Sequence, residues 1–194
     1  MKKKFSPLMI AHLVLMLLVL IFSVFNMIKV FSYLGAGPAN AAPTIIYGVC
    51  SVFNAAAMCA GILYLWNEYG KKAAILYKSF LYLNVVVTVL MLVVNILVDG
   101  QTALKIPAIV ILGVKAVILL VMTFKKDLGK KNTWTLFLAL LILDVAGVVL
   151  MFISMDANLI IHEIHGAAAR LINAGTIALA IRGKYADKDR RGTK

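Results

Sequence analysis

Six long apolar runs follow one another along this chain, and each is about as long as a helix that crosses a membrane. A helix needs about 20 predominantly apolar residues to cross the hydrocarbon core of a bilayer. Of the 194 residues, 63% are hydrophobic and 14% are charged, against about 45–50% and about 25% in soluble domains. The sequence therefore predicts an all-α, polytopic membrane protein with six transmembrane helices, at about residues 7–32, 44–67, 74–98, 103–124, 133–155 and 158–182.

Lysine and arginine are distributed unevenly between the connections, and this distribution predicts the orientation of the chain. Cytoplasmic loops of membrane proteins carry an excess of these residues. The first, third and fifth connections have basic residues only at their edges, Lys29 and Lys105. The other basic residues lie mostly in "MKKK", in the second and fourth connections and in the tail "RGKYADKDRRGTK". Both termini are therefore predicted to be cytoplasmic, in a multi-pass protein of the cell membrane. This asymmetry also explains the net charge of +12, so no nucleic-acid partner is expected.

The connections between the runs are too short to hold a soluble domain. Residues 1–184 are predicted to form a single six-helix transmembrane domain, and residues 185–194 a basic cytoplasmic tail. The first run is interpreted as a retained span, because it is much longer than the apolar core of a signal peptide, which has about 7–15 residues. The lipid bilayer is the predicted partner, and a homo-oligomer is left open.

Two of the runs share a local pattern. "LNVVVTVLM" begins at Leu83, and "LDVAGVVLM" begins at Leu143. Each is followed by a short turn, another apolar run and a basic stretch, as in an internal repeat. The chain is therefore interpreted as three helical hairpins in series, although the first two runs lack the sequence match.

The stretch "GKKNTWTLFLALLILD" has Trp134 at the start of the fifth run and Asp144 near its middle. With the three hairpins and the cytoplasmic termini, it resembles the HdeD-type small membrane proteins linked to acid stress. The likeness covers roughly residues 75 to 182. It implies a six-helix protein of the bacterial inner membrane with a structural or stress-response role and no turnover. The "HEIH" run further along is not carried over from that family.

Three ionisable residues are predicted to lie near the middle of the bilayer: Lys115, Asp144 and Arg170. A charged side chain costs at least about 2.5–3.5 kcal/mol there, so each needs a partner, water or a function. We expect Asp144 to pair with Lys115, with Arg170 or with both. Two cations and one carboxylate leave an excess of positive charge, which fits a small anionic ligand, a lipid headgroup or a lysine kept neutral by desolvation. The alternative is a static ion pair between helices.

The stretch "LIIHEIHGAAARLINAG" places polar residues on one face of the sixth run. On a helical wheel His162, Glu163, Arg170 and Asn173 share a face about 100° wide, and His165 lies about 60° to the other side. Because histidine titrates near physiological pH, this face is interpreted as a proton-responsive or ligand-binding mouth. The alternative is a polar belt in which Glu163 pairs with a nearby base.

The histidines and cysteines do not predict a metal or haem site. The H-E-I-H spacing of His162 and His165 differs from the H-E-x-x-H of zinc enzymes. The remaining histidine, His12, is expected at another depth. Cys50 and Cys59 are nine residues apart, about 180° on a helix, and are interpreted as buried small residues. No cofactor is expected.

Two asparagines complete the predicted site. Asn54 in the second run and Asn84 in the third are expected at mid-depth, where they would face the interior and line the same cavity. No catalytic residue is assigned. The predicted ligand-binding set is Lys115, Asp144, Arg170, His162, Glu163, Asn173, His165, Asn84 and Asn54.

Three classes of function remain open. The first is a binding or transport protein for a small anionic or proton-linked ligand, with a net-positive pocket between the last three spans. Its size and topology are also similar to those of the substrate-binding components of vitamin uptake systems, although their alanine-spaced coupling motif is missing from "IAHLVLMLLVLIF". The second is the non-catalytic stress-response protein that the HdeD resemblance implies. The third is an intramembrane enzyme that uses His162, Glu163 and His165.

Overall fold

The structure is a computed structural model that describes residues 6–34, 41–66, 71–97, 102–125, 128–153 and 160–191. The side chains of some residues at the helix ends, including His162 and Glu163, lie outside the described part.

The described chain is helical, and it contains the six helices that the sequence predicts. All six contain a segment that is long and apolar enough to cross a bilayer, which is consistent with an integral membrane protein of the multi-pass type. Helices form readily in such runs because a bilayer offers no partner for free backbone groups. The helices are α1 (Pro7–Leu34), α2 (Ala41–Trp66), α3 (Lys71–Leu97), α4 (Thr102–Phe124), α5 (Lys130–Ile153) and α6 (Ile160–Arg191).

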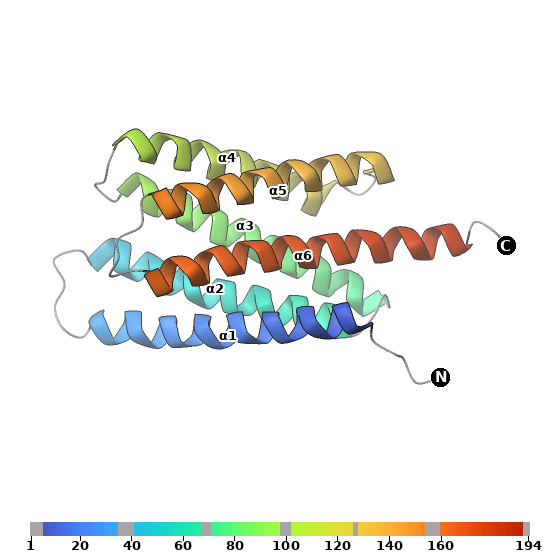
Figure 1. The fold of residues 1–194 in the computed structure, drawn as a ribbon, viewed down its shortest axis with the longest axis horizontal. Coiled ribbons are helices and arrows are strands. Elements are labelled where there is room, and N and C mark those ends of the chain that lie inside the picture. The colour runs from blue at the N-terminus through green and yellow to red at the C-terminus, as the bar shows by residue number, and fades with distance from the viewer. Residues whose placement is uncertain are drawn as a thin grey trace.

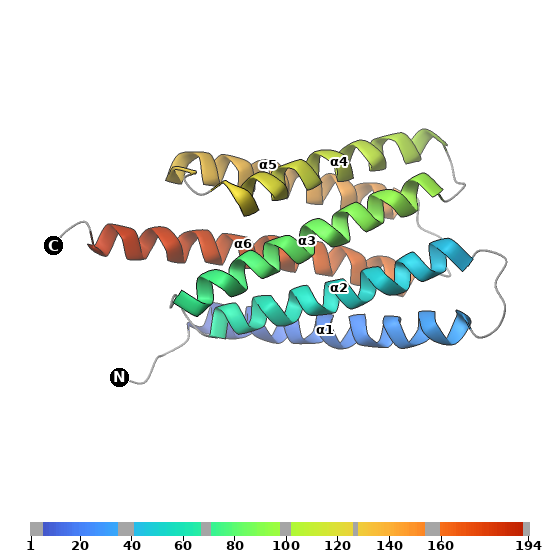
Figure 2. The same ribbon diagram turned by 180° about the vertical axis from the view of Figure 1, so that it is seen from behind.

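The six helices lie side by side along one long axis (Figure 1). Successive helices run in opposite directions, so α1 begins and α6 ends at the same end of the bundle, as the view from behind also shows (Figure 2). Helices that follow one another in the sequence pack together, and α6 closes the arrangement by packing against α1 and α2 as well as α5. Polar side chains on α6 can therefore meet either half of the bundle.

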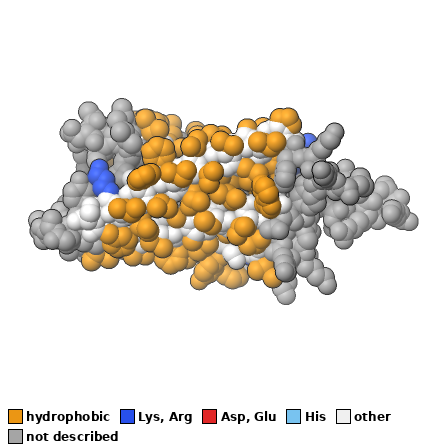
Figure 3. All heavy atoms as spheres, turned by 90° about the horizontal axis from the view of Figure 1, so that it is seen from below, with side chains coloured by type: hydrophobic (Ala, Val, Ile, Leu, Met, Phe, Trp, Pro, Cys, Tyr) orange, Lys and Arg blue, Asp and Glu red, His pale blue; other side chains and the backbone are white. Residues whose placement is uncertain are grey.

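The outer surface of the bundle is apolar. Hydrophobic side chains cover the flank seen in Figure 3, and the visible lysines and arginines lie toward its two ends. On α1 large residues such as Leu17 and Phe25 are exposed, Phe25 to 64%. In water such a surface would drive aggregation, whereas in a bilayer it contacts lipid tails. The surface therefore fits direct contact with lipid along the length of the helices.

Two apolar clusters share the interior. One joins α2, α3, α4, α5 and α6 around Phe80 and Ile177, and the other joins α1, α2 and α6 around Met16 and Met58. Because lipid is as apolar as these side chains, close packing rather than the hydrophobic effect holds such helices together. At Gly61 a Cβ atom would lie 2.6 Å from Met16 Cε and 3.2 Å from Phe80 Cδ2. The absence of a side chain there lets α2 fit between α1 and α3.

One sequence prediction needs correction, and the sixth helix is longer than the span predicted within it. That span was predicted at about residues 158–182, and α6 continues to Arg191, with 32 residues in all. Its membrane-spanning segment extends to Tyr185, and the residues that follow include no proline to stop the helix. Cys59 is exposed, whereas Cys50 is buried as predicted. The separation of the two cysteines around α2 explains this result, because only one side of α2 can face the core.

Candidate functional site

Lys115 and Asp144 form an ion pair between α4 and α5. Lys115 Nζ donates a hydrogen bond to Asp144 Oδ1, as the predicted pairing requires. Asp144 is 1% exposed and the Lys115 side chain 12%. Both residues lie near the middle of their spans, Leu104–Phe124 and Lys130–Ile153. The pair is thus buried and lies far from either end of the helices.

Arg170 reaches this pair from α6. Its guanidinium lies against Gly147, where a Cβ atom would be only 2.1 Å from Arg170 Nη1. Gly147 is one helical turn from Asp144, and Lys115 interacts electrostatically with both Asp144 and Arg170. Arg170 also has an interaction of its own, so it is not an unpaired cation. Three predicted site residues from three different helices therefore meet in one cluster, which we call the charged cluster: Lys115, Asp144 and Arg170.

His165 does not join the charged cluster but faces α1. Asn26 Nδ2 lies 3.3 Å from His165 Nδ1, and His165 Nε2 lies 3.3 Å from both Ser23 Oγ and Val19 O. Asn54 Nδ2 donates to the same Ser23 Oγ at 3.0 Å. We call these residues from α1, α2 and α6 the neutral seam.

The hydrogen bonds of the neutral seam define the form of the imidazole. Because the amide of Asn26 donates to Nδ1, that nitrogen accepts, and the ring hydrogen is on Nε2. Nε2 then donates to the hydroxyl of Ser23 or to the carbonyl of Val19. Ser23 is completely buried. A neutral histidine can make all of these hydrogen bonds, which join α1, α2 and α6.

His12 makes a second polar contact between α1 and α6. Its Nε2 atom is 2.9 Å from Thr176 Oγ1, and the Thr176 hydroxyl donates to Ile172 O at 3.0 Å. The ring lies close to Gly175, where a Cβ atom would be 2.7 Å from His12 Cε1. His12 thus contacts α6 at Thr176, about three helical turns from His165.

Ser23, Asn26 and Thr176 were not among the predicted site residues. On α1 the residues facing α6 are His12, Met16, Val19, Ser23 and Asn26, which recur at intervals of three and four. This spacing defines one face of a helix, so the sequence did contain a signal for a polar stripe on α1. It gave no indication that the stripe contacts His165.

The remaining predicted residues are placed as follows. Asn84 Nδ2 donates to Phe80 O of its own helix at 2.8 Å, so its described hydrogen bond does not reach Asn54 or the charged cluster. Asn173 lies on α6 one turn from Arg170, and its Oδ1 atom is buried. The side chains of His162 and Glu163 lie outside the described residues. Their predicted role at the mouth of the site stays a prediction.

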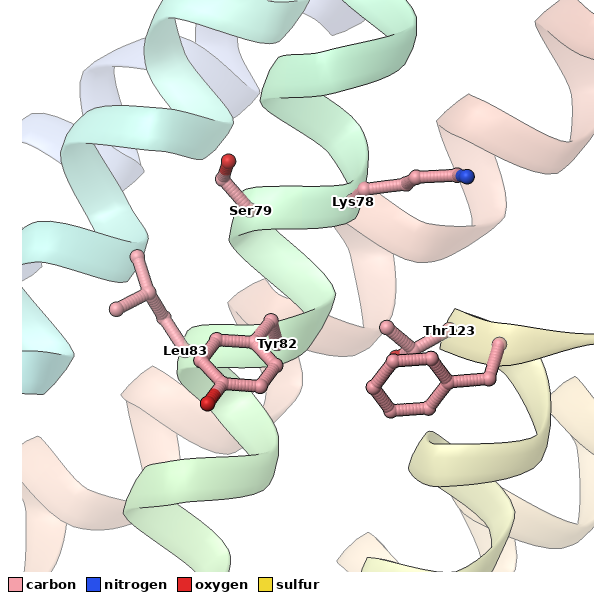
Figure 4. Close-up of a pocket in the computed structure, with 6 residues that line it drawn as sticks. Lys78, Ser79, Tyr82, Leu83 and Thr123 are labelled. Carbon is pink, nitrogen blue, oxygen red and sulfur yellow. The ribbon is translucent and has the colours of Figure 1, made fainter.

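Within the described residues, no group of three or more His, Cys, Asp or Glu side chains is arranged to hold a metal ion. A groove of about 480 Å³ lies between α3 and α4, lined by Lys78, Ser79, Tyr82, Leu83, Thr123 and Phe124. It includes no predicted site residue. Lys78 and Ser79 leave α3 in opposite directions (Figure 4), so these two polar groups do not converge on one point of the groove.

Comparison of the chain with known protein families, with curated proteins and with solved structures gave no match. The functional interpretation therefore depends on the chain's own residues.

Proposed function

We propose that this chain is a membrane protein that binds a small anion in the charged cluster and carries it across the bilayer in a proton-linked manner. The observation behind this proposal is the buried Lys115–Asp144 ion pair with Arg170 beside it. Ionisable groups at this depth are costly and usually mark a pathway or a binding site. An apolar pair of similar volume would often be as stable or more stable.

The chemistry of the cluster favours an anion. Lys115 and Arg170 are two cations near the same point, and Asp144 is the described carboxylate that contacts Lys115. A small anion can replace Asp144 as the partner of Lys115, and the guanidinium offers a planar set of donors suited to oxyanions. Binding would then be a competition between the anion and Asp144 for Lys115.

The proposed orientation places both termini in the cytoplasm. It is supported by the common end of the bundle at which α1 begins and α6 ends (Figure 1), and by the exposed Lys125 just after α4 and the exposed Lys130 and Lys131 at the start of α5. Lysine-rich loops normally stay on the cytoplasmic side. A small anion from outside would then enter from the end where α6 begins.

Transport into lipid vesicles tests this proposal. The full chain is reconstituted with a pH-sensitive dye inside, and chloride, nitrate, phosphate or sulfate is added outside with and without a pH gradient. We expect at least one of these anions to enter with a change in internal pH. Lys115→Met combined with Asp144→Asn should abolish that entry, while Asn95→Ala serves as the control, because the Asn95 amide donates to Met91 O of its own helix at 2.9 Å. Equal entry in the double variant and the native chain would contradict the proposal.

The second candidate is a static role, in which the charged cluster binds no ligand. The burial of the cluster favours this role. Asp144 is 1% exposed, and the groove between α3 and α4 includes none of the three charged residues. In this case Lys115 and Asp144 hold α4 and α5 together, as in the non-catalytic protein that the HdeD resemblance implies. A folded double variant with unchanged thermal stability, together with no anion entry in the native chain, would favour this second candidate.

A further inference from the structure

Helices α5 and α6 pack in a register that two close contacts define. Met151 Cε would be 2.8 Å from a Cβ atom on Gly166, and Arg170 Nη1 would be 2.1 Å from one on Gly147. The second contact lies four residues earlier on α5, at Gly147 rather than Met151. It lies four residues later on α6, at Arg170 rather than Gly166. The two helices are antiparallel (Figure 1), so this is the step expected of neighbours that face each other.

The same register can be followed three residues further, back from Gly147 along α5 and forward from Arg170 along α6. It brings Asp144 of α5 opposite Asn173 of α6. The pairing of Thr133 with Tyr185, at 2.9 Å between their hydroxyl oxygens, shows nearly the same register near the other end of α5. Asp144 and Gly147 are three residues apart, as are Arg170 and Asn173, so each pair shares one face of its helix. The carboxyl and the amide therefore lie at one level of the α5–α6 interface.

Both groups present an acceptor without a donor. Asp144 Oδ2 and Asn173 Oδ1 are buried, and neither has a hydrogen-bond partner among the residues that the structure describes. Asp144 Oδ1 is already bound by Lys115. A buried acceptor without a donor is costly, and such atoms are rare in native proteins. A hydrogen placed between two such atoms at the same level of one interface would satisfy both of them.

We infer that Asp144 and Asn173 form a proton-binding site, in which protonated Asp144 Oδ2 donates a hydrogen bond to Asn173 Oδ1. A proton from water forms the new O–H bond at Oδ2, and the donating hydronium ion is left as water. A neutral carboxyl holds Lys115 less strongly than a carboxylate does, so the protonated state leaves Lys115 ready to bind an anion.

The charges around Asp144 support a proton rather than a metal cation. Lys115 faces it from α4 and Arg170 from α6, and α5 has no other charged residue between Lys131 and Ile153. A metal cation needs several oxygen ligands and would be repelled by both bases. A proton meets the same repulsion, but it needs no additional space and supplies the donor that both oxygens require. Uptake of one anion then restores the total charge of the cluster.

The proton-binding site does not depend on the proposed function. Only its consequence does, which is that one proton enters together with one anionic charge. The site itself is tested without any anion. Infrared spectra of the full chain in lipid bilayers are recorded as a function of pH, in H₂O and D₂O, for the native chain and for Asp144→Asn. We expect a carboxylic acid carbonyl band that appears as the pH falls, shifts in D₂O and is missing from Asp144→Asn.

Asn173→Ala tests the acceptor. Without the amide oxygen, the protonated form loses a hydrogen bond of about 1 kcal/mol, so the band should be weaker in this variant than in the native chain under the same conditions. The band should also move, because the O–H group changes its partner. Asn95→Ala is the matched control, since Asn95 bonds to Met91 of its own helix, and it should leave the band unchanged.

The outcomes separate the two proposals. No band attributable to Asp144 at any pH at which the chain remains folded would overturn the proton site, even if anions enter vesicles. A band that Asn173→Ala leaves unchanged would overturn the role of Asn173, as would a water molecule between the two oxygens in a high-resolution structure. A band with the expected shifts, but without entry of any anion, would support the proton site and contradict the transport proposal.

Discussion

The charged cluster and the neutral seam both place polar atoms inside the membrane-spanning bundle, but they differ in how those atoms are satisfied. In the neutral seam, both ring nitrogens of His165 and the hydroxyl of Ser23 have hydrogen-bond partners. In the charged cluster, Lys115 and Asp144 carry opposite charges, and Asp144 Oδ2 has no partner within the described residues. The two clusters share α6 and lie on opposite sides of it.

This difference indicates separate roles for the two clusters. Much of α1 faces outward, with large residues such as Leu17 and Phe25 exposed, while its inner face packs through Met16 and Val19 in the apolar cluster with α2 and α6. Interhelical hydrogen bonds in membranes are modest, about 0.6 kcal/mol on average, but a set of them determines which face of α1 meets α6. The charged cluster costs more to bury, because its side chains are ionisable.

The largest expected effect is that of Asp144→Ala. Removal of the carboxyl leaves the Lys115 ammonium buried without its partner, and such single changes cost about 3–5 kcal/mol. Lys115→Met in the same chain should restore most of the stability, because an apolar pair replaces the ion pair. The measurement is the free energy of unfolding of both variants in detergent micelles. Equal destabilisation in the single and the double variant would mean that the ion pair is not the relevant contact.

A smaller effect is expected from Gly175→Ala, which changes a contact between α1 and α6. The added Cβ atom would lie 2.7 Å from His12 Cε1, so the ring must move away from Thr176. Overpacking of this kind costs about 1–3 kcal/mol. Gly113→Ala is the matched control, because no atom lies within 4 Å of a Cβ atom there. Thermal unfolding should separate the two variants, and similar melting temperatures would argue against the close packing of His12.

The smallest effect is expected from Ser23→Ala in the neutral seam. Asn54 and His165 both lose a partner, and the cost should lie within the range of about 0.6–1.7 kcal/mol for polar contacts between membrane helices. Ser51→Ala is the control, since Ser51 Oγ donates to Tyr47 O of the same helix at 3.0 Å. Denaturation of both variants measures the difference. A loss from Ser23→Ala as large as that from Asp144→Ala would remove the contrast between the two clusters.

The pairing of Lys115 with Asp144 was predictable from the sequence, because opposite charges at the same expected depth of adjacent spans have few other partners. The meeting of Arg170 with this pair was also anticipated, since its position along the sixth span set its depth. The contact of Arg170 with Gly147 was not anticipated. A helical wheel gives the direction of a side chain but does not identify the helix that it contacts. For the same reason the contact of His165 with α1 was not predicted.

The sequence by itself determined the class of this protein and the depth of its polar residues, because hydropathy and the length of a run depend only on local composition. It also determined which charges could pair. Only the tertiary structure decided which helices surround α6, and therefore divided its polar residues between two clusters. The reason is that packing between helices in lipid depends on side-chain shape and close approach, as at Gly147 and Gly175, and these contacts join residues far apart in the chain.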